Sequence, residues 1–190
     1  HELFQWFFHQ LQFDNYTLDL DSTVSTRYGE QEGAAVGYNP KKRGRKSHHS
    51  LGAFVAESRM VVNYWLRPGN TSATNNIFSF CCDTLSRLRG KKIGLVRADS
   101  GFHDQAIFTY LEKEEHHIPY IIAMRFHAPI KRLIASLKTW TALDTGIEIT
   151  DFAAQHAKAR YAELVRAPGI AAAFAGAEIP IAGAVLVHFQ

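Results

Sequence analysis

The sequence is poor in cysteine and opens without a secretory signal. Its 190 residues include two cysteines, Cys81 and Cys82, which are adjacent. Adjacent cysteines rarely bridge one another, and this pair lacks the spacing of a metal site, so we expect two reduced thiols. No charged segment followed by an apolar one stands at the N-terminus. These absences favour a cytoplasmic protein without disulfides.

The chain also lacks a large excess of charge of either sign. Its formal net charge is +3 and its pI is about 8.9, so the placement of the charges matters more than their sum. Hydrophobic content of 46% and charged content of 21% are ordinary for a globular protein of one sizeable domain. The chain begins with His1 inside a segment of helical pattern, so we expect a fragment of a longer protein.

Predicted strands alternate with predicted helices over most of the chain. Helices are predicted over residues 2–12, 75–89, 104–115 and 128–138, and strands over residues 17–24, 34–38, 58–66, 91–99 and 119–126. The polar stretch 25–51 is otherwise expected to be loop. This alternation predicts an α/β domain with a partly parallel sheet, whose sites gather beyond the carboxyl ends of strands. Asp21 and Asp99 both lie near such ends.

The stretch DLDST contains two carboxylates, Asp19 and Asp21, that share one face of a predicted strand. The pattern D-x-D-x-T resembles that of haloacid dehalogenase-like phosphatases, in which the first acid attacks phosphorus and the second is a general acid. Asp99 and Asp104 would then stand for the acidic pair that holds magnesium in that family. The phosphatase family enters a helix soon after this pattern, whereas here a long Gly-rich, basic stretch follows.

A longer series of motifs resembles the DDE transposases of bacterial insertion sequences. An acid before Ser-Thr, a Gly-rich basic stretch, a strand ending in Arg-Pro-Gly-Asn and the run Val-Arg-Ala-Asp-Ser-Gly-Phe follow in that family's order. The likeness covers residues 12–140. It implies an α/β, ribonuclease H-like fold, a mixed sheet flanked by helices, present here as an incomplete catalytic domain over residues 1–140.

The resemblance also implies a metal-dependent nucleotidyl-transfer site. The family's first two acids fall on Asp21 and Asp99, which would bind Mg²⁺ or Mn²⁺, while Asp19 would be structural or support a ligand. The family's third acid is a glutamate flanked by Tyr, Arg and Lys, and no such signature follows Asp99. The third ligand is therefore unassigned, which leaves both an active chain and a catalytically incomplete one open.

Five cations crowd into the six positions 41–46. In isolation such a run is a solvated loop, but between strands of a transposase-like domain it predicts contacts with DNA phosphates. The expected partner is the double-stranded DNA of transposon ends, bound by a homodimer in the full-length protein. The proposed DNA-binding residues are Lys41, Lys42, Arg43, Arg45 and Lys46.

Histidines are frequent, but their spacing does not suggest metal ligands. The adjacent pairs at 48–49 and 116–117 are expected to be surface or loop residues, since neighbouring side chains of a strand point apart. Arg97 and His103 flank Asp99 and are candidates for phosphate contacts.

Residues 141–190 differ in character from the rest. From Ala167 to Gln190 there is one acid, Glu178, there is no lysine or arginine, and alanine and glycine abound. Glu178, Pro180 and the glycines argue against a membrane helix, so no membrane partner is expected. We expect a divergent tail, truncated or frame-shifted, that packs poorly.

The sequence therefore favours a DDE transposase fragment that acts in DNA strand cleavage and transfer. Two alternatives stay open. One is a phosphatase that uses Asp19 as nucleophile together with Asp21, and the other is a DNA-binding remnant without catalysis.

Overall fold

The computed structural model describes residues 2–88, 90–123, 128, 132, 135–144, 147–152, 162–166 and 185–188. The chain divides into two compact units, His1–Arg97 and Ala98–Gln190, and each is described by itself. Among the described helices, none is long and apolar enough to cross a membrane.

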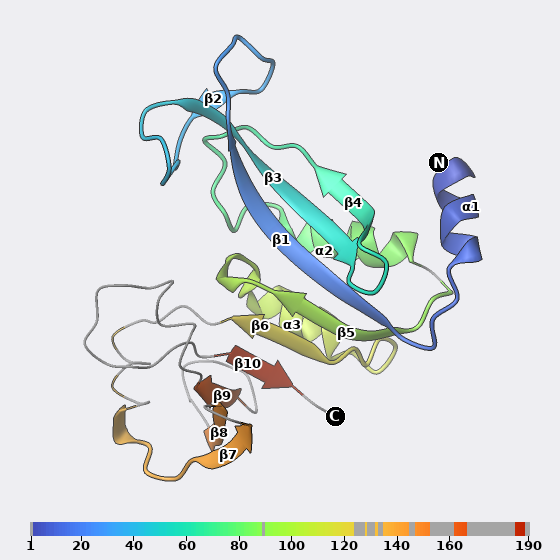
Figure 1. The fold of residues 1–190 in the computed structure, drawn as a ribbon, viewed down its shortest axis with the longest axis vertical. Coiled ribbons are helices and arrows are strands. Elements are labelled where there is room, and N and C mark those ends of the chain that lie inside the picture. The colour runs from blue at the N-terminus through green and yellow to red at the C-terminus, as the bar shows by residue number, and fades with distance from the viewer. Residues whose placement is uncertain are drawn as a thin grey trace. The chain divides into compact units, whose positions relative to one another are not determined.

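The first unit is built on an antiparallel ladder (Figure 1). Its strands are β1 (Tyr16–Thr26), β2 (Ala35–Val36), β3 (Lys46–Val55), β4 (Met60–Trp65) and β5 (Ile93–Ala98). β1 pairs with β3 from Leu18 opposite Val55 to Thr26 opposite Ser47. β2 and β4 pair antiparallel with β3, and β5 lies next to β1. β3 thus pairs with three of the other four strands, and β5 joins the sheet through β1.

Alternation of apolar and polar residues explains β1. Tyr16, Leu18 and Leu20 are buried, whereas Asp19 is half-buried and Asp21 is exposed. Side chains two apart in a strand share a face, so the two acids face away from the buried side chains. The strand predicted over residues 17–24 is confirmed, and it extends by a residue or two at each end.

β3 corrects the prediction of loop over most of residues 25–51. His48 and His49, predicted as surface or loop residues, are 4% and 3% exposed in this central strand. His48 Nδ1 accepts from Arg27 Nε at 3.1 Å, and His49 Nδ1 lies 3.0 Å from the Thr71 carbonyl oxygen. Buried polar groups need such partners. Because both faces of β3 are covered, its polar first half shows no alternation that would predict a strand.

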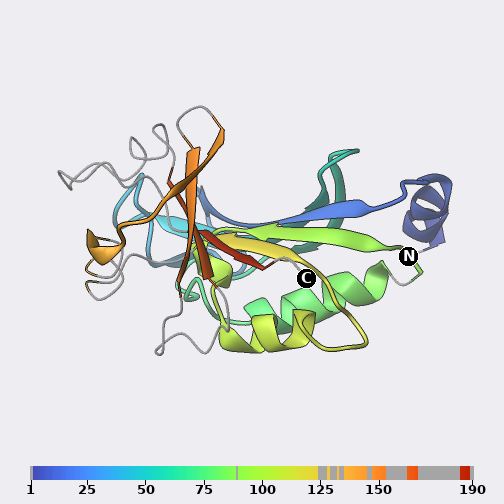
Figure 2. The ribbon, with the colours of Figure 1, turned by 90° about the horizontal axis from the view of Figure 1, so that it is seen from below.

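α2 (Ile77–Arg87) packs on β3 and β4, along one face of the unit's sheet (Figure 2). The helix lies within the predicted range 75–89. Its buried residues include Phe80, whereas Phe78 is 39% exposed. The cysteines of α2 are free thiols, as predicted, and burial raises the pKa of Cys81 to about 12.

Asp83 ties α2 to β4. Its Oδ2 accepts from Asn63 Nδ2 at 2.8 Å, from Trp65 Nε1 at 3.1 Å and from Arg87 at 3.2 Å. Burial raises the pKa of Asp83, but hydrogen bonds from Asn63, Arg87 and Trp65 outweigh it, and the net shift is downward. The carboxylate therefore serves the fold in its charged form.

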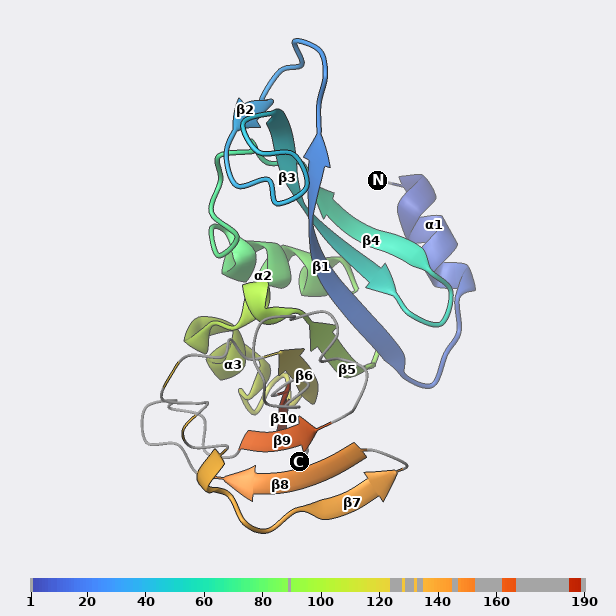
Figure 3. The same ribbon diagram turned by 60° about the vertical axis from the view of Figure 1, so that its left-hand side comes forward.

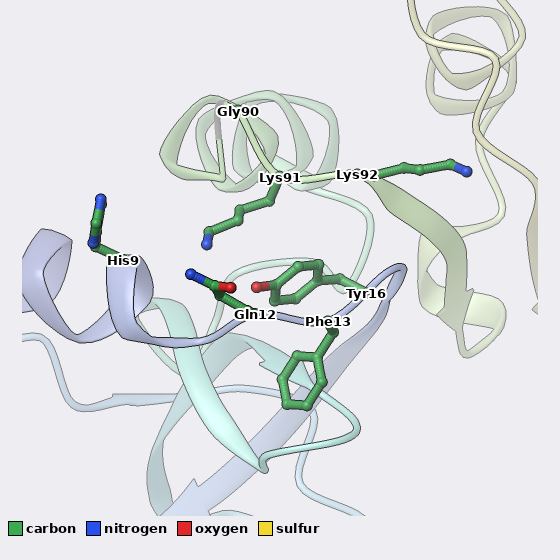
Figure 4. A pocket seen from close by; sticks show the side chains of 7 residues that line it. All are labelled: His9, Gln12, Phe13, Tyr16, Gly90, Lys91 and Lys92. Atoms are coloured by element: carbon green, nitrogen blue, oxygen red, sulfur yellow. The ribbon is translucent and has the colours of Figure 1, made fainter.

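The linker between α1 (Glu2–Gln10) and β1 is fixed from two sides. Tyr16 Oη donates to the Leu11 carbonyl oxygen at 2.5 Å, and Lys91 Nζ donates to the same oxygen at 2.7 Å. A cavity of about 580 Å³ lies beside this junction (Figure 4), with the ammonium of Lys91 turned toward Gln12 and Tyr16. Its lining consists of His9, Gln12, Phe13, Tyr16, Gly90, Lys91 and Lys92.

The turn after β4 is locked by Arg67 and Gly69. Arg67 is 5% exposed, and its Nε donates to the His49 carbonyl oxygen at 2.9 Å. Gly69 packs so closely on the backbone oxygens of Ala35 and Ser47 that a Cβ at this position would clash with both. The Arg-Pro-Gly-Asn motif therefore lets the backbone of this turn pack directly on the backbones of β2 and β3.

The second unit contains η1, one α-helix and five strands among its described residues. They are η1 (Ser100–Phe102), α3 (Gln105–Leu111), β6 (Tyr120–Ala123), β7 (Thr141–Asp144), β8 (Ile147–Phe152), β9 (Ala162–Arg166) and β10 (Val185–His188). β6 pairs with β10, and β7, β8 and β9 form an antiparallel sheet that the sequence analysis did not predict. The helix predicted over residues 128–138 lies largely outside the described residues.

α3 confirms the helix predicted over residues 104–115, but it ends at Leu111. Asp104 caps it by accepting from Ala106 N at 2.8 Å, and Ile107, Phe108 and Leu111 are buried. Phe108 stacks on Tyr120 of β6 with ring centroids 5.2 Å apart. The pair at residues 116–117 lies in the loop before β6, as expected.

We predict that Gly69→Ala destabilises the chain by about 1–3 kcal/mol, because the new methyl group would clash with the backbone oxygens of Ala35 and Ser47. Gly29→Ala is the matched control, since an added Cβ there meets nothing within 4 Å, and it should change stability by less than about 0.5 kcal/mol. Urea unfolding of both variants measures the difference. Equal urea midpoints for the two variants would contradict the close packing of Gly69 on β2 and β3.

Candidate active-site carboxylates

Three polar side chains follow at spacing two on one face of β1. They are Asp19, Asp21 and Thr23, and the ladder with β3 places them opposite Phe54, Gly52 and Ser50. The sequence presents two acids of similar context, but the structure gives them different partners.

Asp19 is engaged by an arginine. Arg97, near the end of β5, donates from Nε to Oδ1 at 2.6 Å and from Nη2 to Oδ2 at 2.7 Å. Such a bidentate pair is stronger than a single contact, and the hydrogen bond to Asp19 raises the pKa of Arg97. The guanidinium predicted to contact phosphate is therefore committed to a carboxylate in this structure.

Asp21 is exposed, and the hydrogen bond that it accepts comes from its own strand. Thr23 Oγ1 donates to its Oδ2 at 2.8 Å, which orients the carboxylate along β1. A carboxylate has two oxygens and about four acceptor sites, so this bond leaves room for a metal ion or further donors. Asp21 thus has the surroundings of a ligand, and Asp19 has those of a structural acid.

Asp99 follows β5 directly and belongs to the second unit. Its extended backbone begins η1, and its Oδ1 accepts from Gly101 N at 2.8 Å. The side chain is exposed, and a capping bond to one oxygen is compatible with a metal bond from the same carboxylate. His103, the other predicted phosphate contact, packs edge to face on Phe108 at 5.1 Å.

The chemistry of Asp21 and Asp99 suits a hard divalent cation, because both are carboxylate residues exposed at the surface. Within the part of the chain that the structure describes, no group of three or more His, Cys, Asp or Glu side chains is placed to hold a metal ion. The third ligand therefore stays unassigned, as in the sequence.

Four of the five predicted DNA-binding cations lie in the loop that leads into β3, and the fifth is the first residue of β3. Residues 27–45, here called the basic arm, connect β1 to β3 and include β2 (Figure 3). Lys46 forms an ion pair of 2.6 Å with Glu30, and Lys42 and Arg45 lie over the ring of Tyr28. The exposed cations of the arm are Lys41, Lys42, Arg43 and Arg45.

The strand order of the first unit, its helix α2 on the sheet and the exposed acid on β1 define a mixed α/β domain of the ribonuclease H-like class. The model of the family described as "Transposase DDE domain group 1" matches residues 3–163. The chain belongs to this family. The match extends beyond residues 12–140 at both ends and confirms the transposase resemblance and the fold class, rather than the phosphatase interpretation.

A solved transposase shares the fold. A piggyBac transposase in a synaptic complex with hairpin DNA is 16% identical, with a TM-score of 0.53, and the alignment covers 84% of this chain and 35% of that one. A Mos1 transposase bound to a left transposon end is 15% identical, with a TM-score of 0.38, covering 58% and 37% of the chains. The chain thus spans about 35% of the piggyBac transposase chain. Comparison with the curated proteins finds no match.

We predict measurable coupling between Asp19 and Arg97. In a double-mutant cycle of Asp19→Asn and Arg97→Gln, the pair should contribute about 0.5–1 kcal/mol to stability, because both side chains are partly exposed to water, and less in high salt. The looser exposed pair of Lys113 and Glu115, at 3.7 Å, is the control and should give a smaller value. Zero coupling between Asp19 and Arg97 in low salt would contradict the assignment.

Proposed function

We propose that this chain is part of a transposase that cleaves DNA strands at transposon ends and transfers them. One observation carries the proposal. In a chain of the DDE family, the acid before Ser-Thr is exposed and lightly bonded, while its neighbour two positions earlier is held by an arginine.

Asp21 and Asp99 are the proposed ligands of Mg²⁺ or Mn²⁺. When bound, such a metal supplies a Lewis acid that lowers the energy of the attacking and leaving oxygens of a phosphodiester. Thr23 orients Asp21 through its hydroxyl, and Arg97 neutralises Asp19, so that Asp19 does not compete for the cation. The third acid stays unassigned, and the division between a catalytic part over residues 1–140 and a divergent tail over residues 141–190 stays a prediction.

The basic arm is the proposed phosphate-binding element. Lys41, Lys42, Arg43 and Arg45 are exposed on it, and Lys46 begins β3. Each phosphate that they neutralise releases counterions, so affinity falls with salt and is largely independent of sequence. The partner would be double-stranded DNA, bound by a homodimer of the whole transposase.

We predict that Asp21→Asn and Asp99→Asn each abolish magnesium-dependent nicking of supercoiled plasmid. Asp19→Asn should be milder, with a loss of less than about tenfold, because Asp19 touches Arg97 and not the metal. Gel quantification of nicked circles over time gives the rates. Glu114→Gln, an exposed acid of the second unit, serves as the control.

Other outcomes separate the alternatives. Loss of phosphate-ester hydrolysis on Asp19→Asn would support the phosphatase interpretation. A chain that binds DNA in a salt-dependent way without nicking it would be a DNA-binding remnant and would refute the catalytic proposal for this chain.

A further inference from the structure

The basic arm carries two tyrosines that the folded unit leaves exposed. Tyr28 is 69% exposed and Tyr38 is 73% exposed. Tyr38 lies in the stretch 33–46, which contains five cations and no acid, and Tyr28 precedes the arm's two acids, Glu30 and Glu32. Single exposed tyrosines are common on protein surfaces. What distinguishes these two is the set of contacts by which the arm holds them.

Tyr28 stands among the cations. Lys42 Nζ lies 4.9 Å from the ring centroid and Arg45 Cζ lies 5.9 Å from it. Lys42 also contacts the Tyr28 hydroxyl. These contacts fix the ring at the point where phosphates would be bound, since a cation over an aromatic face is attracted to it.

Tyr38 has a fixed backbone and an exposed ring. On one side Gly37 packs so tightly against the Gly69 backbone that no side chain fits there. On the other side Asn39 is 4% exposed, donates to Thr26 Oγ1 at 2.9 Å and accepts from Lys42 N at 2.9 Å. The ring thus faces solvent from a backbone that is already fixed. Binding a ligand therefore costs little conformational entropy of the backbone.

Exposed rings beside cations suit single-stranded nucleic acid. Aromatic side chains stack on bases while a positive surface follows the backbone, and base stacking is tolerant of sequence. Stacking needs an open base face, which a fully paired duplex offers only at its ends. An acidic peptide would use the cations but would gain little from the two rings.

We propose that the basic arm binds unpaired nucleotides of DNA, with Tyr28 and Tyr38 as stacking platforms and the arm's cations on the adjoining phosphates. This inference rests on the proposed DNA-binding function and adds to it a preference for DNA with unpaired bases. Figures 1 and 3 show the arm beyond the end of the ladder between β1 and β3.

The test compares two DNAs of the same sequence by fluorescence anisotropy, a blunt duplex and a duplex with a single-stranded overhang. The unmodified chain should bind the overhang DNA more tightly. Tyr38→Ala should weaken binding to the overhang DNA by about tenfold and binding to the blunt duplex by less than about twofold. Tyr38→Phe should retain binding, because stacking needs the ring and not the hydroxyl.

Two controls keep the result specific. Tyr64→Ala removes a tyrosine of β4 that is 53% exposed and lies outside the arm, and it should change neither affinity. Arg43→Ala should weaken binding to both DNAs by the same factor and reduce the salt dependence of binding to both. Thermal melting of each variant confirms that the fold is kept.

The inference is overturned if Tyr38→Ala weakens binding to both DNAs equally or changes the affinity for neither. It is also overturned if Tyr64→Ala weakens binding to the overhang DNA as much as Tyr38→Ala does. Equal binding of the two DNAs by the unmodified chain, with normal salt dependence, would overturn the stacking proposal and leave the DNA-binding function standing. Absence of binding to either DNA would refute the DNA-binding function itself.

Discussion

The antiparallel ladder between β1 and β3 is the constraint on which the first unit depends. Its register, from Leu18 opposite Val55 to Thr26 opposite Ser47, decides which face of β1 is buried. A slip of one residue would turn Leu18 and Leu20 outward and bury Asp19 and Asp21. The same ladder sets the two ends of the basic arm, so acid placement and arm placement follow from one set of hydrogen bonds.

The ladder places two acids on one face, and their partners then separate them. Arg97 satisfies both oxygens of Asp19, whereas Thr23 donates to one oxygen of Asp21. A charged side chain held by two hydrogen bonds has less to gain from a cation than one that keeps its acceptor sites. This difference in hydrogen bonding, rather than the identity of the residues, supports Asp21 as the ligand.

The sequence predicted the parts of the fold with a clear period. β1, α3 and β6 were found where alternation or helical spacing predicted them. β3 was missed because its first half, Lys-Ser-His-His-Ser, is polar and is buried through hydrogen bonds. Arg97 was assigned to phosphate because its partner, Asp19, is distant in sequence. Tyr28 and Tyr38 lacked a signal, since exposure is a property of the folded arm.

Anomalous scattering from Mn²⁺ bound to crystals of the chain tests the central assignment most directly. The account predicts a manganese peak at coordination distance from Asp21, with Arg97 still paired to Asp19. A peak on Asp19 with Arg97 displaced would contradict it.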